Sequence, residues 1–318
     1  MKATVLKGIN NIFTVQFISE TQSSDAQLPG TQLCRIKGKV LPGAGQDYNP
    51  LAPGDMVEID NGLIISRYPR KNRLYRWNRK RNNLQVFAAN IDQLLIFGSV
   101  KSPPLRPRFI DRVLVMAENA HVDCIIVINK LELGPAEDEL QRLETYRQLG
   151  YKVIMVSAYT GAGLDTLKHC LQAKRSVLYG QSGVGKSSCL NALFPHLDLS
   201  VGGLSKKHNR GTHTTNYGVL LEGEAMGGLG IIDTPGIREL HLPGYTSSEV
   251  ASGFRDIHAY GDSCEFDGCT HVHEPGCKVK KALADNLLHP DRYQSYLNIL
   301  SDNEFLQAQY GVLNMERE

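Results

Sequence analysis

The sequence predicts a central α/β domain with a mostly parallel sheet, a small β-barrel before it and a mostly helical segment after it. Unbroken apolar runs with helical patterns between them predict the sheet, because strands covered on both faces need not alternate. Short alternating runs separated by turns predict the barrel. A chain of 318 residues has room for two or three domains of this size.

The first part of the chain contains short runs that alternate in character, at residues 12–18, 32–37 and 56–59. Turns rich in glycine and proline, at residues 41–45 and 52–55, lie between the second run and the third. Several short strands in so few residues are typical of a small barrel such as the OB-fold. We therefore predict an OB-fold β-barrel over residues 1–82.

The middle part of the chain alternates between predicted strands and helices. Apolar runs predict strands at residues 93–97, 124–128, 153–156, 176–179 and 230–232. Helical patterns lie among them at residues 109–119 and 136–149. This alternation predicts a mostly parallel α/β sheet over residues 83–242.

The last part of the chain is polar and helical. Its patterns predict helices over residues 248–257, 279–288 and 292–300. Three cysteines and two histidines stand just before the last two of these helices. Residues 243–318 are therefore predicted to form a mostly helical C-terminal domain around that cluster.

Composition places the chain among globular proteins of a reducing compartment. The net charge of +2 indicates no particular partner, so any basic surface must be local. No apolar run is long enough to span a membrane, and the first residues lack the apolar core of a signal peptide. We expect a cytoplasmic protein. The seven cysteines do not suggest a disulfide framework, and the scattered ones are expected to be small buried hydrophobes: Cys34, Cys124, Cys170 and Cys189.

Residues 180–187 match the phosphate-loop pattern G-x-x-x-x-G-K-[ST] at every fixed position. The motif follows a predicted strand and precedes an apolar helix, so its backbone N–H groups and the helix N-terminus can surround phosphates. Lys186 is expected to reach the outer phosphates, and Ser187 to bind Mg²⁺. The predicted phosphate-binding residues are Gly180, Gln181, Ser182, Gly183, Val184, Gly185, Lys186, Ser187 and Ser188.

The D-x-P-G sequence that begins at Asp233 follows the strand at residues 230–232. The carboxylate is expected to hold Mg²⁺ through water, and the N–H of Gly236 to meet the γ-phosphate. Between the two motifs, the polar loop at residues 205–215 carries threonines that could complete the Mg²⁺ shell. Such a loop would order with the γ-phosphate and be released after hydrolysis.

Two further motifs predict base selection. Asn129, Lys130 and Glu132 end a strand in the pattern N-K-x-E, where GTPases select guanine with N-K-x-D. Glutamate is still an acceptor, although it is one methylene longer. Ser157 and Ala158 end the next strand and resemble the second base-contacting motif. These motifs precede the phosphate loop, so the chain is predicted to be a circularly permuted P-loop GTPase, since a parallel sheet can be opened at one loop and rejoined at another.

The late cluster has the spacing C-x4-C-x-H-x5-C, with His273 as a possible substitute ligand. Three thiolates and an imidazole suit a tetrahedral structural Zn²⁺, one per chain. No open coordination position is implied, so catalysis at the metal is not expected. The predicted ligands are Cys264, Cys269, His271 and Cys277.

Residues 67–81 carry eight basic residues, no acid and three aromatic residues, Tyr68, Tyr75 and Trp77. Basic side chains contact phosphates, and aromatic rings stack on exposed bases. Because the total charge is near neutral, this local excess predicts RNA contact by the N-terminal domain. A solvated charge run is the alternative.

Taken together, a β-barrel, permuted GTPase motifs and a Cys₃His module resemble the ribosome small subunit-dependent GTPase A family. The resemblance covers nearly the whole chain and includes the loop from Gly211 to Thr215. It implies a bacterial GTPase that binds the immature small ribosomal subunit and its rRNA, is stimulated by them, and helps to release assembly factors such as RbfA. It further implies Mg²⁺ with GTP or GDP. From the lack of a long apolar run we expect no membrane association, and we expect a monomer.

The resemblance also implies roles for individual residues. Lys186, Asp233 and Gly236 keep the phosphate roles given above. Thr215, with Thr214 as the alternative, matches the threonine that binds Mg²⁺ beside Ser187, and His213 matches a histidine implicated in hydrolysis. Ile237 stands where many GTPases have a glutamine that orients water, so intrinsic hydrolysis is expected to be slow.

Two other hypotheses about function remain open from the sequence. An ATP-using P-loop protein, such as a kinase or assembly ATPase, predicts no guanine preference, and it leaves Asn129, Lys130, Ser157 and Ala158 unexplained. An RNA-binding zinc protein that holds nucleotide as a structural ligand predicts no turnover, even with ribosomes. Equal affinities for GTP and ATP would refute the expected preference for GTP.

Overall fold

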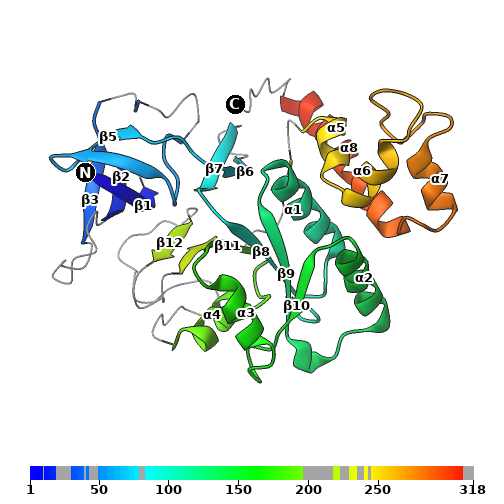
Figure 1. Ribbon diagram of the computed structural model, residues 1–318, viewed down its shortest axis with the longest axis horizontal. Coiled ribbons are helices and arrows are strands. Elements are labelled where there is room, and N and C mark those ends of the chain that lie inside the picture. The colour runs from blue at the N-terminus through cyan, green and yellow to red at the C-terminus, as the bar shows by residue number, and fades with distance from the viewer. Residues whose placement is uncertain are drawn as a thin grey trace.

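The structure is a computed structural model that describes residues 1–9, 11–18, 30–38, 41–42, 49–78, 83–195, 218–222, 229–234, 240–242 and 245–310. Three bodies follow one another along the chain: a barrel, a six-stranded sheet with helices on both faces, and a group of C-terminal helices (Figure 1). Among the described helices, none has the length and apolar character that a membrane span requires.

The predicted N-terminal barrel is confirmed as a closed five-stranded barrel. Its strands pair in the order β1-β2-β3-β5-β4, and alternate side chains such as Val5, Val15 and Ile64 fill the interior. The bounds are β1 (Lys2–Ile9), β2 (Ile12–Phe17), β3 (Thr31–Ile36), β4 (Met56–Asp60) and β5 (Leu63–Arg67). A hairpin of β6 (Arg73–Asn78) and β7 (Asn83–Ala89) then leads to the central sheet.

Three side chains of the basic stretch are buried in the fold and do not face solvent. The Nε and Nη2 atoms of Arg70 each donate to a carboxylate oxygen of Asp55 at 2.7 Å, and Arg67 lies 4.0 Å from the same carboxylate. The side chains of Arg67 and Arg70 are 6% and 3% exposed. Trp77 is also buried, at 9% exposure. These three residues therefore cannot serve the predicted RNA contact as the sequence suggested, because buried side chains do not reach a polynucleotide.

The central sheet has the strand order β10-β9-β8-β11-β13-β12. All its pairs are parallel except the edge pair of β12 with β13, and β12 was not predicted. Helices α1 and α2 cover one face, and α3 and α4 the other. The bounds are β8 (Gln93–Ser99), α1 (Pro107–Asn119), β9 (Asp123–Asn129), η1 (Leu131–Leu133), α2 (Glu137–Gln148), β10 (Lys152–Met155), α3 (Leu164–Leu171), β11 (Arg175–Gly180), α4 (Lys186–Leu193), β12 (Val219–Glu222) and β13 (Gly230–Asp233).

Four C-terminal helices follow the sheet in the described part of the chain. They are α5 (Ser247–Ser252), α6 (Arg255–Gly261), α7 (Lys278–Ala284) and α8 (Pro290–Tyr310). Of these, α5 and α8 pack directly on α1, while α6 packs on α5 and α7 on α6. The single helix predicted over residues 248–257 is wrong, because the helix ends at Gly253 and Phe254 is extended, with φ of −108° and ψ of 102°. Gly253 lies so close to α1 that a Cβ would be 2.8 Å from the Cα of Val115. Residues of α1, α5, α6 and α8 share one continuous apolar core.

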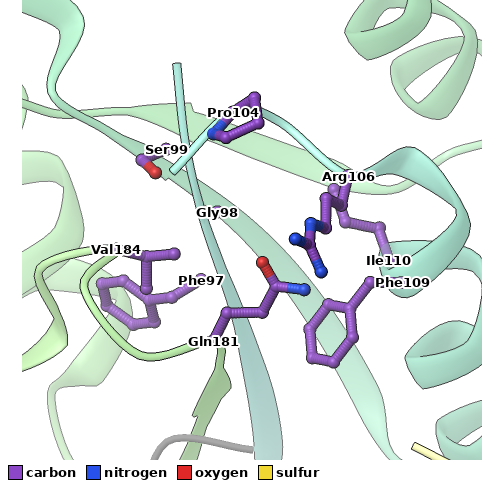
Figure 2. A pocket seen from close by; sticks show the side chains of 9 residues that line it. All are labelled: Phe97, Gly98, Ser99, Pro104, Arg106, Phe109, Ile110, Gln181 and Val184. Carbon is purple, nitrogen blue, oxygen red and sulfur yellow. The ribbon is translucent and has the colours of Figure 1, made fainter. Parts of the chain in front are cut away.

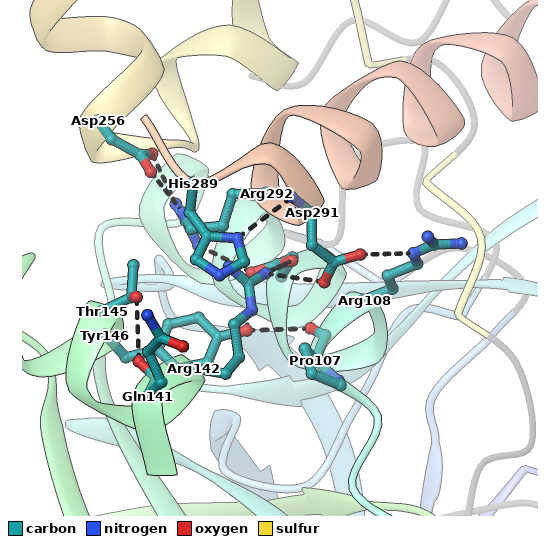
Figure 3. A network of polar contacts seen from close by, with 11 residues as sticks. Pro107, Arg108, Gln141, Arg142, Thr145, Tyr146, Asp256, His289, Asp291 and Arg292 are labelled. Carbon is teal, nitrogen blue, oxygen red and sulfur yellow. Dashed lines mark hydrogen bonds and ion pairs between the residues drawn. The ribbon is translucent and has the colours of Figure 1, made fainter. Parts of the chain in front are cut away.

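A buried ionic network joins the C-terminal helices to α1 and α2 (Figure 3). Arg292 of α8 donates to Asp111 of α1 at 2.8 Å and to Asp256 of α6 at 2.7 Å. Asp111 also accepts from Arg142 and Tyr146 of α2, at 2.7 and 2.9 Å. Burial works against the charge of Arg292, but the two carboxylates more than offset this and raise its pKa. Asp111 thus ties α1 to α2 and to α8 at the same time.

Candidate nucleotide-binding and metal sites

The phosphate loop has the predicted context, because it joins the C-terminal end of β11 to the N-terminus of α4. Gly183 and Gly185 adopt φ angles of +82° and +95°, which side chains with a Cβ rarely adopt. A Cβ at Gly185 would also lie 2.1 Å from Nδ2 of Asn129. The glycines therefore give the loop its tight turn and let Asn129 approach it.

Lys186 lies at the centre of the loop. Its Nζ donates to the carbonyl oxygens of Gly180 at 2.8 Å and Gln181 at 3.1 Å. Burial lowers the pKa of Lys186, and the nearby charge of Asp233 opposes that shift. Burial likewise raises the pKa of Asp233, and Lys186 opposes it. The two charges are thus close enough to affect one another, as is expected of residues that bind one phosphate and its metal ion.

Asn129 connects the base-selecting motifs to the phosphate loop. Its Nδ2 donates to the carbonyl of Val184 at 3.0 Å, and its Oδ1 accepts from the N–H of Ala158 at 3.1 Å. Ser157 is buried, and its Oγ accepts from the N–H of Thr160 at 3.0 Å. The side-chain amide of Asn129 therefore brings together the two base motifs and the phosphate loop, although the base motifs precede that loop in the sequence.

Lys130 and Glu132, the other residues of the predicted base-selecting motif, lie beside this junction. Lys130 is in the left-handed region, with φ of +64°, and its Nζ donates to the carbonyl of Ser102. Glu132 lies in the short helix η1 and is exposed. Burial is the larger cause of the raised pKa of the Cys189 thiol, which belongs to α4, and the charge of Glu132 raises it further. An exposed carboxylate close to α4 is available to a ligand that enters next to the phosphate loop.

Several predicted residues lie outside the described part of the chain: His213, Thr214, Thr215, Gly236 and Ile237. Of the predicted Mg²⁺ ligands, the structure describes Ser187, which is half-buried in the first turn of α4. Together with the carboxylate of Asp233, its hydroxyl offers the oxygen ligands that Mg²⁺ prefers. These residues fit a magnesium ion held between the loop and the end of β13.

The predicted zinc ligands converge. The Sγ atoms of Cys264 and Cys277 are 3.9 Å apart, and both lie within 3.6 Å of Nδ1 of His271. All four ligand atoms, including Sγ of Cys269, fall within 4.8 Å of one another. Zn–S and Zn–N bonds of about 2.3 and 2.0 Å in a tetrahedron require ligand separations of roughly 3.5 to 3.8 Å. The cluster therefore fits a tetrahedral Zn²⁺.

A hub of hydrogen bonds holds the zinc cluster in shape. Glu274 accepts from the backbone N–H groups of Thr270, Val272 and His273 at 2.8, 3.0 and 3.2 Å. Burial opposes its ionisation, but these bonds and that of the Thr270 hydroxyl lower the pKa of Glu274 to about 2. The sequence analysis did not identify Glu274. Its position between two predicted zinc ligands, His271 and Cys277, was the one indication of such a role.

A hollow beside the phosphate loop was also missed. The end of β8, the start of α1 and the phosphate loop line it, and Arg106 and Gln181 direct their side chains into it (Figure 2). Phe97 and Phe109 form its apolar walls. No sequence motif marks this hollow, because its residues meet only through the packing of the sheet.

Three features define a P-loop GTPase with permuted motif order. They are the phosphate loop, the D-x-P-G motif at the end of a later strand, and the asparagine that joins the base motifs to the loop. A family model described as RsgA GTPase matches residues 67–243. The chain belongs to the RsgA GTPase family, and it is accordingly a GTPase, a hydrolase.

Proteins similar to the whole chain agree with this assignment. A "Small ribosomal subunit biogenesis GTPase RsgA" of Borreliella burgdorferi is 36% identical over 303 residues, covering 94% of this chain and 95% of that protein. The protein of the same name from Porphyromonas gingivalis is 39% identical over 289 residues, covering 86% and 91%. The crystal structure of YjeQ from Thermotoga maritima matches with a TM-score of 0.68 at 29% identity, covering 99% of both chains. That of YloQ, described as a circularly permuted GTPase, matches with a TM-score of 0.68 at 27% identity, covering 96% and 95%.

Proposed function

We propose that this GTPase acts in the maturation of the small ribosomal subunit. In this proposal it binds the subunit and its rRNA, hydrolyses GTP to GDP and phosphate late in maturation, and releases assembly factors. One observation carries the proposal: the similarity to small ribosomal subunit biogenesis GTPases extends over the barrel, the GTPase core and the Cys₃His module alike. A P-loop core alone would be compatible with many activities.

The proposal assigns a task to each part of the chain. Residues 1–82 form the OB-fold that contacts rRNA, residues 83–242 the permuted GTPase domain, and residues 243–318 the zinc domain. Ser187, Thr215 and Asp233 hold Mg²⁺ with the nucleotide, and the cluster described above holds one Zn²⁺. His213, in the loop that precedes Thr215, supplies a group for hydrolysis once rRNA fixes it. The protein works as a cytoplasmic monomer.

Hydrolysis of GTP and of ATP by the full chain, measured with and without purified small ribosomal subunits, tests the proposal. We expect slow GTP turnover by the free chain, a rise of at least tenfold with subunits, and little ATP turnover, since Ile237 leaves the free enzyme without a water-orienting amide. His213→Ala is expected to remove the stimulation while leaving GTP binding intact.

Other outcomes would contradict the proposal in distinct ways. Equal turnover of ATP would favour the ATP-using assembly factor. If small subunits leave the rate of GTP turnover unchanged, the ribosomal role would be excluded, while the GTPase activity would stand. The absence of turnover under every condition would favour an RNA-binding zinc protein with nucleotide as a structural ligand. Unchanged stimulation in His213→Ala would exclude that histidine from the reaction.

A further inference from the structure

Arg106 is a cation without a counter-charge beside the phosphate loop. It is exposed, and in the part of the chain that the structure describes it has no carboxylate and no hydrogen-bond acceptor as partner. The arginines of the helix that follows it are paired: Arg108 with Asp291 at 3.2 Å, and Arg112 with Asp302. An unpaired cation next to an anion-binding loop suggests that its partner is the bound anion.

The backbone that carries Arg106 is fixed against the nucleotide site. Ser99 Oγ donates to the carbonyl of Pro103 at 2.7 Å, and Lys130 of the base-selecting motif donates to Ser102. Pro103 lies against the phosphate loop, since a Cβ on Gly183 would be 3.6 Å from its Cδ. Helix α1 then begins directly after Arg106, and the buried Asp111 anchors that helix one turn later. The guanidinium is therefore carried by a rigid support.

The hollow that Arg106 enters adjoins the outer-phosphate end of the loop. The lysine of a phosphate loop reaches the β- and γ-phosphates. Here its Nζ donates to the carbonyls of Gly180 and Gln181, so Gln181 lies beside the ammonium group that would reach those phosphates. Gln181 and Arg106 line the same hollow, with both side chains directed into it (Figure 2). A flexible arginine side chain can move from this hollow onto the γ-phosphate edge.

We propose that Arg106 is a further catalytic residue that contacts the γ-phosphate of GTP. As water oxygen bonds to the γ-phosphorus and the bond to the β–γ bridging oxygen breaks, negative charge grows on the leaving oxygen of GDP. The guanidinium of Arg106 donates hydrogen bonds to the γ-phosphate and bridging oxygens, while the proton of the attacking water leaves with phosphate. The chain thus supplies from the residue before α1 an arginine that many GTPases receive from a partner. This inference rests on the GTPase activity and needs no ribosomal role.

Single-turnover GTP hydrolysis by the zinc-loaded full chain tests the role of Arg106. The variants are Arg106→Ala and Arg106→Lys, with Arg108→Ala as the matched control on the opposite side of the same helix turn. Arg106→Ala is expected to lower the hydrolysis rate about 10³-fold, and Arg106→Lys to recover only part of it, because lysine lacks the planar fork. Arg108→Ala is expected to hydrolyse GTP like the parent chain.

Affinity for GDP with Mg²⁺ and aluminium fluoride separates a catalytic role from a structural one. Because the contact forms as charge develops, Arg106→Ala is expected to lose binding of the fluoride complex while its affinity for GDP stays within twofold. A hydrolysis rate within threefold of the parent, or unchanged affinity for the fluoride complex, would overturn the proposal. Parallel loss of GDP affinity would also overturn it, since it would make Arg106 a structural residue. If the parent chain itself fails to hydrolyse GTP, the enzyme assignment fails instead.

Discussion

Arg292→Ala is expected to lower the free energy of unfolding by about 3 to 5 kcal/mol, the usual cost of removing one partner from a buried ion pair. The side chain of Arg292 is 1% exposed. Among the described residues, its loss leaves Asp256 without a cationic partner and Asp111 with one of its two. The guanidinium also stacks 4.9 Å from the ring centroid of Phe254. Chemical denaturation of the zinc-loaded chain, followed by circular dichroism, measures the change.

Two comparisons make this test specific. Arg108→Ala removes an ion pair whose side chains are 56% and 34% exposed, so it is expected to cost less than about 1 kcal/mol. The double variant Arg292→Met with Asp256→Leu replaces charge by apolar volume and is expected to regain much of the lost stability. A loss below 1 kcal/mol in Arg292→Ala would contradict the role of this network in joining α8 to α1.

Cys277→Ala is expected to abolish stoichiometric zinc binding and to unfold the segment between α6 and α7. A structural zinc site of four protein ligands contributes about 10 to 16 kcal/mol of apparent binding free energy at neutral pH, and it drives folding. Cys277 is buried, and its Sγ lies 3.5 Å from Nδ1 of His271. Metal content after gel filtration, and thermal unfolding with and without a chelator, measure the effect.

His273→Ala is the matched control for the zinc site. His273 is the substitute ligand that the sequence leaves possible, but the ligand atoms that converge belong to His271 and the three cysteines. The control is expected to retain one zinc and the melting temperature of the parent chain. Full zinc content in Cys277→Ala, or its loss in His273→Ala, would show that the ligand set is wrong.

The sequence predicted those parts of the site that depend on local backbone. The phosphate loop and the cysteine cluster are contiguous motifs, and their glycines and spacings fix the geometry almost without help from the rest of the fold. The parallel strands were predictable for a similar reason, because burial on both faces leaves unbroken apolar runs. The permuted order of the motifs did not hide them, since each one ends its own strand.

The sequence did not predict features that depend on distant partners. Arg67 and Arg70 belong to a basic run, and only the fold brings the buried Asp55 to them. The helix break after Gly253 occurs where this glycine packs closely against Val115, more than 130 residues earlier. The place of Arg106 beside the phosphate loop likewise depends on the packing of α1 against the sheet. Local patterns carry no record of such contacts.

The central claim is that a permuted chain assembles a guanine site in which Glu132 reads the base next to the phosphate loop. Binding of GDP and of xanthosine diphosphate to the parent chain and to Glu132→Gln tests it most directly. Xanthine carries a carbonyl where guanine has the exocyclic amine, so a carboxylate suits guanine and an amide N–H suits xanthine. A site built to hydrogen-bond one group rejects the analogue that lacks it strongly, by up to about 10⁴-fold. We predict that Glu132→Gln loses GDP affinity by at least tenfold and gains affinity for xanthosine diphosphate; unchanged preference for GDP in this variant would contradict the account.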